Sequence, residues 1–409
     1  MTTLIKRRQF LAGATALAAS GALLTSQLSF AAAKTEARFV FVILRGALDG
    51  LTAVPPYGDV DYAGLRGSLA LAAPGAVGGA FRLDDRFALH PSLAFMSESF
   101  SAGELTVFHA VASPYRERSH FDGQDVIENG HLRPHAAQTG WLNRALSALP
   151  VDRSFASREQ GVALGQNVPL VMRGEAPVAS WSPSKLAALD EDTLGRITDL
   201  YAGDKVLSRR LADALRANTI AMKGRSMSGA DANMRGPARF METVTATAAF
   251  LRRDDGPRVA VFDTTGWDTH ANEGAEQGQL AGRLAALDSG LRELKQGLGE
   301  EVWPRTMVLL VTEFGRTAAT NGTRGTDHGT GSAAFLLGGA VAGGRVVADW
   351  PGLAPGALYQ ARDLAPTLDM RSVIKGVMSE HLRVSTRALD NEVFPDSRQA
   401  RPLTGLVRA

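Results

Sequence analysis

Residues 37–51 read ARFVFVILRGALDGL, an apolar run that ends in two glycines and a single aspartate. From Phe39 to Leu44 every side chain is aliphatic or aromatic, without the polar alternation of a strand that has one face in water. A continuous apolar run of this length predicts a β-strand that is covered on both faces. This strand therefore indicates a sheet buried between two layers, and the fold prediction starts from it.

Four further apolar runs have the same character: 104–112, 257–264, 305–314 and 333–341. Helical patterns lie between them. In 279–296, for example, leucines at 280, 284, 287, 291 and 294 fall on one helical face. Alternating strands and helices predict an α/β fold. We expect residues 34–409 to form a single domain, with a helical insertion within 150–255.

The N-terminal segment 1–33 has the layout of an export signal, with a basic start, an apolar stretch and small residues at its end. Arg7 and Arg8, followed by Gln-Phe-Leu, match the twin-arginine pattern. This predicts passage through the twin-arginine translocase and a periplasmic or extracellular location. The other interpretation is an uncleaved amphipathic anchor. No later segment is expected to span a membrane.

Composition excludes several classes of site. The chain has no cysteine, which excludes disulfides, cysteine nucleophiles and zinc–thiolate sites. The formal net charge of +2 falls to −1 once the three basic residues of the signal are removed with no acid. No basic tract remains that would indicate nucleic-acid binding.

Acidic residues and histidines follow the predicted strands. In open α/β sheets, ligands bind beyond the carboxyl ends of the strands. The first run delivers an aspartate, the second is followed by SHFDGQD, the third by WDTH, and the fourth by a glutamate and then RGTDHGTG. The candidate ligands collected in this way are Asp49, Asp268, His270, Glu313, Asp327 and His328.

Such a mixture of carboxylates and imidazoles suits one or two divalent cations, zinc first and manganese, calcium or magnesium as alternatives. Ser119 lies at the expected start of a helix, where a hydroxyl can act as a nucleophile on phosphorus or sulfur. His120 would assist it or bind the metal. An anionic substrate group would meet Arg116, Arg118 or Arg316.

Each of these residues also has a structural interpretation. Asp49 with Gly50 is a turn pair, Ser119 is a helix N-cap type, and Glu313 has Arg316 three residues away. His90, in FALHPSL, and His109, inside a predicted strand, are expected to be structural or to support the ligands from behind.

The motifs, taken in order, resemble an exported bacterial family, domain of unknown function 1501. They are LDGLTAVPPY, LHPSL, RSHFDGQD, TGWLNRAL, GWDTHANE, TEFGRT, NGTRGTDHG and LLGGAVAGGRV. That family is similar in organisation to the alkaline phosphatase and sulfatase superfamily. The resemblance implies a doubly wound three-layer α/β/α sandwich with a metal site at the strand ends. It also implies that Asp49 is the first ligand, Ser119 the nucleophile, Asp268 and His270 a ligand pair, and His328 the late histidine.

The chain departs from the superfamily at several positions. Glu313-Phe314 stands where Asp-His is common, and Ala112 occupies the first position of the sulfatase nucleophile pattern, which argues against a formylglycine enzyme. The sequence therefore predicts an exported metal-dependent hydrolase of phosphate or sulfate esters. The alternative is a non-catalytic binding or assembly protein of the cell envelope that retains the fold.

Overall fold

The computed structural model describes residues 36–149, 159–183, 191–222 and 237–408. The predicted export signal, 1–33, lies outside the described residues. Where the chain is described, none of its helices has the length and apolar character needed to cross a membrane.

The first predicted strand lies inside a mixed nine-stranded sheet. β1 (Arg38–Arg45) pairs in parallel with β7 (Val259–Thr265) on one side and β8 (Thr306–Val311) on the other. The strand order is β10-β4-β9-β8-β1-β7-β5-β6, with β11 beside β4. All five predicted strands are confirmed, the other two being β4 (Leu105–Ala112) and β9 (Ser332–Leu337).

The remaining strands are short. They are β5 (Gly161–Leu164), β6 (Val178–Trp181), β10 (Arg345–Val347) and β11 (Leu368–Asp369), with a separate hairpin of β2 (Phe81–Arg82) and β3 (Ala88–Leu89). β9 runs antiparallel to both β4 and β8, whereas the other described pairs in the large sheet are parallel.

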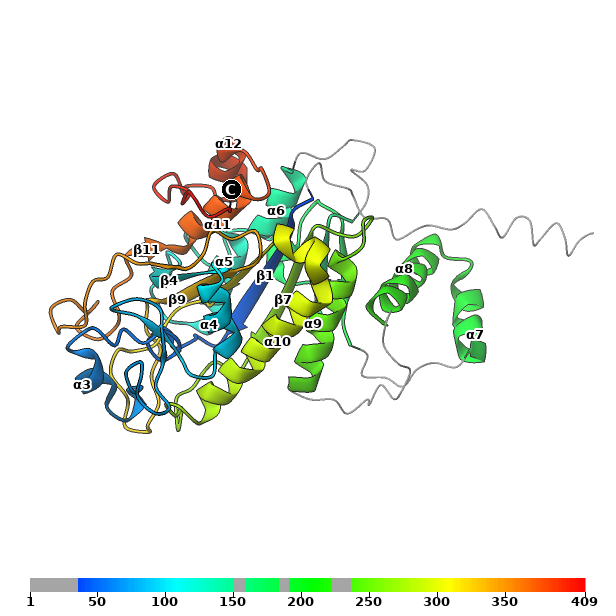
Figure 1. Cartoon of the computed structure of the whole chain (residues 1–409). Coiled ribbons are helices and arrows are strands. Elements are labelled where there is room, and N and C mark those ends of the chain that lie inside the picture. The colour runs from blue at the N-terminus through cyan, green and yellow to red at the C-terminus, as the bar shows by residue number, and fades with distance from the viewer. Residues whose placement is uncertain (1–35, 150–158, 184–190, 223–236, 409) are drawn as a thin grey trace, which may run out of the picture.

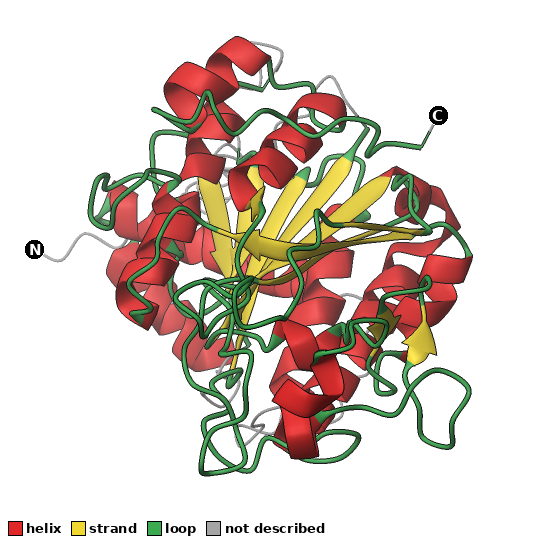
Figure 2. Cartoon of the chain, turned by 90° about the vertical axis from the view of Figure 1, so that its left-hand side faces the viewer, coloured by secondary structure: helices red, strands yellow, loops and turns green. Residues whose placement is uncertain are grey.

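Helices cover both faces of the sheet, as Figures 1 and 2 show. Alternate residues of β1 point to opposite sides, so Val40 and Val42 join one apolar core and Phe39 and Phe41 the other. The first core is closed by α4 (Ala94–Ser101), α8 (Lys205–Met222), α9 (Pro237–Leu251) and α10 (Gln279–Val302). The second is closed by α5 (His120–Asn129), α6 (Trp141–Ser147), α11 (Met370–Glu380) and α12 (Thr386–Ala388). The α/β/α sandwich is therefore confirmed.

α10 shows why this sequence forms a helix on a sheet. The five leucines predicted to share one face are all buried in the first core, and so is a sixth, Leu298. The helix has a kink at Gly299, whose φ of 70° is non-helical. Shorter helices are α2 (Gly50–Ala53) and α3 (Tyr62–Arg66), and single turns occupy Gly67–Leu69, Leu170–Met172, Trp303–Arg305 and Leu389–Val393.

The segment predicted as a helical insertion, 150–255, is only partly helical. It contributes α7 (Glu191–Tyr201), α8 and α9, but β5 and β6 in the same segment extend the central sheet. In Figure 1, α7 and α8 lie at the side of the molecule. β5, β6 and α9 thus belong to the sandwich, and a helical insertion within 150–255 stays a prediction.

The sheet brings the carboxyl ends of its central strands to one edge. Ile43 of β1 is in register with Asp263 of β7 and with Val311 of β8. The loops that follow these three strands therefore begin side by side, and they carry most of the acidic residues and histidines singled out in the sequence.

Candidate metal centre

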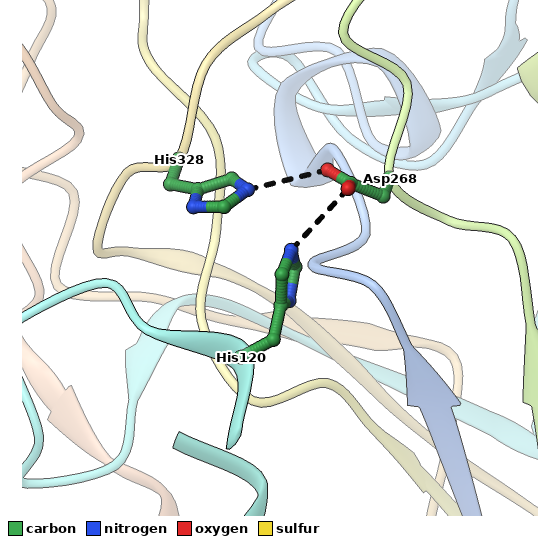
Figure 3. A group of neighbouring side chains, drawn as sticks. All are labelled: His120, Asp268 and His328. Carbon is green, nitrogen blue, oxygen red and sulfur yellow. Dashed lines mark hydrogen bonds and ion pairs between the residues drawn. The ribbon is translucent and has the colours of Figure 1, made fainter. Parts of the chain in front are cut away.

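Side chains from separate segments meet at this edge of the sheet (Figure 3). His120 is the first residue of α5, Asp268 lies in the loop after β7, and His328 lies in the loop between β8 and β9. One nitrogen of each imidazole and one oxygen of Asp268 all lie within 4.8 Å of one another. Among the described residues, this is the one set of three such side chains close enough to share a metal ion.

The orientation of His120 is fixed from behind by a buried carboxylate. Its Nδ1 lies 2.8 Å from Oε1 of Glu313, and that oxygen also accepts hydrogen bonds from Gln124 Nε2 at 3.1 Å and Gly46 N at 2.8 Å. The bond to Glu313 raises the pKa of His120. Burial alone would raise the pKa of Glu313, but these hydrogen bonds lower it overall. Nε2 of His120 is left buried without a hydrogen-bond partner, 3.5 Å from Asp268 Oδ2.

His328 is held in the same way by a backbone carbonyl. Its Nδ1 lies 2.9 Å from the carbonyl oxygen of Arg118, and because a carbonyl can only accept, Nδ1 carries the hydrogen. Burial lowers the pKa of His328, which favours the neutral ring. Its Nε2 lone pair then faces Asp268 Oδ1 at 3.3 Å. A lone pair that faces a carboxylate is unfavourable unless a cation or a proton lies between them.

His270 completes the pattern. Its Nδ1 lies 3.2 Å from Oδ1 of Asp327, and its Nε2 lies 3.0 Å from Asp268 Oδ1 and 3.0 Å from His328 Nε2. Two ring nitrogens at that distance can share one hydrogen at most. A hydrogen bond from Asn321 lowers the pKa of Asp327, which keeps that carboxylate ionised as the acceptor. All three imidazoles therefore have Nδ1 against an acceptor and Nε2 against Asp268.

Asp268 also has a permanent cationic partner. Arg316, which is buried, donates through Nη1 to Asp268 Oδ1 at 2.8 Å. Burial tends to raise the pKa of Asp268, but Arg316 and the neighbouring imidazoles lower it overall. Arg316 therefore pairs with Asp268. The structural interpretation of the sequence had instead paired it with Glu313, three residues away.

These donors fit a divalent metal ion. Metal-binding histidines commonly donate their second ring N–H to a carboxylate or a carbonyl, which fixes the ring and directs the other nitrogen at the ion. Here Glu313, Asp327 and the carbonyl of Arg118 take that second N–H. Three imidazoles and one carboxylate, without sulfur, suit zinc. The orphaned Nε2 of His120 is the polar atom that such an ion would satisfy.

Asp49 lies in a second, fully buried cluster. Its carboxylate caps α2 by accepting from the N–H groups of Leu51 and Thr52, and it forms an ion pair with Arg66 Nη2. Glu273 shares this cluster, 3.8 Å from Arg66 and 3.2 Å from the hydroxyl of Thr52. Burial and the charge of Asp49 raise the pKa of Glu273 to about 8, while Arg66 offsets the burial of Asp49 and lowers the pKa of that carboxyl. The structure thus joins Asp49 to Arg66 and Glu273 rather than to the three histidines.

Ser119 is the N-cap residue of α5, directly before His120, but its side chain makes no capping hydrogen bond. Its N–H donates to the hydroxyl of Tyr115 at 3.2 Å. The other two predicted anion-binding arginines also have protein partners: Arg116 donates to the carbonyls of Ser113 and Tyr115, and Arg118 to Asp363 and Gln360.

Sequence reasoning missed Glu273, Arg66 and Gln124. Glu273 closes the stretch GWDTHANE, whose aspartate and histidine were selected, and its position within that stretch was the available signal. Arg66 gives no such signal, because it follows the first strand by a long and irregular segment. His90 and His109 are buried and bonded to the carbonyls of Ala275 and Val54, as expected of structural histidines.

Comparison with solved structures finds weak similarities. One is to Ps i-CgsB in complex with a neocarrahexaose, at 10% identity and a TM-score of 0.42, covering 90% of this chain and 77% of that one. Another is to the phosphonate monoester hydrolase of Agrobacterium radiobacter, at 10% identity and a TM-score of 0.34, covering 76% and 70%. A third is to the zinc complex of the C-terminal periplasmic domain of EcEptC from Escherichia coli, at 10% identity and a TM-score of 0.30, covering 76% and 75%.

Curated proteins give no match to this sequence. A family model described as "Protein of unknown function (DUF1501)" matches residues 36–393, which is nearly all of the described chain. The chain belongs to the DUF1501 family.

Proposed function

We propose that this protein is a metal-dependent hydrolase of phosphate or sulfate esters, exported through the twin-arginine pathway to the periplasm or the cell exterior. The observation that carries the proposal is the shared orientation of His120, His270 and His328 around Asp268. A divalent cation in this position would stabilise negative charge on an ester oxygen. The remaining steps belong to the chain's own residues.

Ser119 is the proposed nucleophile. Its hydroxyl oxygen forms a bond to phosphorus or sulfur, the bond from that atom to the ester oxygen breaks, and the hydroxyl proton leaves with the alcohol. Water then releases the anion from Ser119. The position supports this role, because Ser119 adjoins His120 and its side chain is not used to cap α5. Glu313 and the carbonyl of Arg118 hold two of the imidazoles still, and Arg316 orients Asp268.

The buried cluster supports one ion rather than two. Asp49 and Glu273 are buried acidic side chains near this edge, and the guanidinium of Arg66 already lies against both. An internal arginine supplies the positive charge that a second ion would bring. We therefore expect about one equivalent of metal per chain, bound by the histidine group.

The test is metal content measured by plasma mass spectrometry on exported, mature protein, beside the double variant Asp268→Ala/His328→Ala. The wild type should hold about one equivalent of a divalent metal, and the double variant should lose it. Ser119→Ala should keep the metal and lose turnover of aryl phosphate or aryl sulfate by about 10³-fold or more. Metal-free wild type, or full activity in Ser119→Ala, would overturn the corresponding part of the proposal.

The second candidate is a non-catalytic binding protein of the envelope. The pairing of Asp268 with Arg316 favours it, because that ion pair neutralises the one carboxylate of the histidine group without a metal. In that case the folded wild type would contain no metal, and Ser119→Ala would leave the envelope function unchanged.

A further inference from the structure

A cavity of about 820 Å³ lies at the same edge of the sheet as the metal centre. Its walls come from the carboxyl ends of β5, β6 and β7, from α9, and from the first turns of α10. Ligand sites in open α/β sheets lie at this edge, and this volume is within the usual range for small-molecule sites.

The cavity and the metal centre share part of the chain. Thr265 and Trp267 line the cavity, and the next residue is Asp268. The cavity and the metal centre are also connected by a series of polar contacts. Asp263 in the cavity wall pairs with Arg45, which donates to Gln124 Oε1 at 3.0 Å, and Gln124 donates to Glu313, the carboxylate behind His120.

The lining has the chemistry of a site for a hydroxylated anion. Arg239, Arg283 and one carboxylate, Asp263, line the cavity, and Arg45 pairs with that carboxylate. Arg283 makes a single long bond, 3.3 Å to the carbonyl of Thr265. The other polar groups of the lining are neutral hydroxyls and amides, from Gln166, Ser182, Thr243, Thr264, Thr265 and Gln279.

The rest of the lining is apolar, including Leu164, Phe240 and Leu287. An apolar lining with a few hydroxyls and amides and the guanidinium of Arg283 suits an organic molecule with hydroxyl groups and a negative charge. An inorganic anion alone would leave most of this volume and its hydroxyls unused.

We propose that this cavity binds the non-reacting part of the substrate, a hydroxylated organic group with its own negative charge, while the ester group lies at the metal centre. This inference rests on the proposed function for the role of its ligand. The assignment of the cavity as a binding site depends only on whether such an anion binds there. Binding can be measured without turnover.

The experiment is titration calorimetry on the double variant Asp268→Ala/His328→Ala, in which the metal centre cannot hold an anion through its ion. The probe is glucose 6-phosphate, with glucose and inorganic phosphate as its two separate halves. We expect glucose 6-phosphate to bind at least about tenfold more tightly than either half. Adding Arg283→Gln should weaken that binding about tenfold or more, and Thr243→Val should also weaken it.

Arg292→Gln is the matched control, because Arg292 is on the same helix but pairs with Glu98 outside the cavity. Equal binding of glucose 6-phosphate and inorganic phosphate, no binding of glucose 6-phosphate, or an equal loss in the Arg292 variant would overturn the inference. Tight, Arg283-dependent binding by a protein that hydrolyses no ester would instead leave the cavity assigned and remove the proposed hydrolase function.

Discussion

The three histidines of the metal centre differ in the acceptor that each Nδ1 meets. A buried glutamate holds His120, a solvent-exposed aspartate holds His270, and a backbone carbonyl holds His328. In each case the acceptor, and not the imidazole, decides which nitrogen faces Asp268. The chemistry of this site at the residue scale therefore depends on groups that would never touch a substrate.

Glu273 does not belong to the histidine group of the metal centre, but its removal should disturb the loops that hold this group. Its Oε2 accepts from the hydroxyls of Thr269 and Thr326, each at 2.9 Å, and so it ties the loop after β7 to the loop before β9. We expect Glu273→Ala to weaken metal binding by roughly 10- to 100-fold. It should also lower the free energy of unfolding by about 3 kcal/mol, because the buried hydroxyls of Thr52, Thr269 and Thr326 lose the acceptor they share.

Chelator competition measures the metal affinity, and urea unfolding of the metal-free protein measures the stability. Glu273→Gln keeps an oxygen for both threonines and should retain most of the affinity. Glu276→Ala, exposed in the same loop, is the control. The role assigned to Glu273 is wrong if Glu273→Ala binds metal as tightly as the control.

Strand-end position was sufficient to select His120, Asp268, His270 and His328, because parallel strands bring their carboxyl ends to one edge whatever the loops contain. The same rule selected Asp49, but it did not predict that Asp49 pairs with Arg66. Asp49 lies beside Arg66 because an irregular segment folds back over α2, and no periodicity in the sequence reports such a return.

Among the elements, long buried strands were predictable and short ones were not. β1, β4 and β8 are continuous apolar runs with almost no exposed residue, so their sequence alone indicates a sheet covered on both faces. β5 and β6 have four residues each and follow segments rich in polar residues and proline. β5 is a strand because it pairs with the edge of β7, and β6 because it pairs with β5, a tertiary effect that local sequence does not record.

The end of β1 offers a test of how closely elements must approach at the site. Gly46 follows β1 with a φ of 119°, and a Cβ there would lie 2.7 Å from the backbone nitrogen of Asp268. Gly46 N also donates to Glu313. We expect Gly46→Ala to cost about 1–3 kcal/mol of stability, through backbone strain and displacement of the Asp268 loop. Metal affinity should fall with it.

Gly64→Ala is the matched control, since Gly64 lies in α3 and a Cβ there meets nothing within 4 Å. Alanine in a helix should be neutral or slightly stabilising there. Thermal unfolding and chelator competition on both variants give the comparison. Equal stability and affinity in the two variants would show that the Asp268 loop does not depend on this approach.

For the molecule as a whole, buried ionisable groups set opposite dependences of stability on pH. His109 in β4 and His381 after α11 bond to backbone carbonyls, and burial lowers the pKa of each from 6.5 to about 4. Below pH 6.5 these two histidines bind protons in the unfolded chain but stay neutral in the folded chain. The stability of the folded protein therefore falls as the pH drops from 6.5 to 4. Glu273 acts in the opposite direction, because its pKa is raised from 4.5 to about 8. Its contribution to the stability of the protein falls as the pH rises from 4.5 to 8.

The two histidines together outweigh the single glutamate between pH 4.5 and 6.5, so the metal-free protein should become less stable toward acid. Each histidine contributes a slope of about 1.4 kcal/mol per pH unit there. Urea unfolding at pH 4.5, 5.5, 6.5 and 7.5 should show this acid limb in the wild type. His109→Gln/His381→Gln, with an amide to replace each ring N–H, should flatten it, because the two histidines whose pKa burial lowers to about 4 are then gone. His135→Gln, at an exposed position, should keep the wild-type slope. An acid limb that persists unchanged in the double variant would show that His109 and His381 are not its origin.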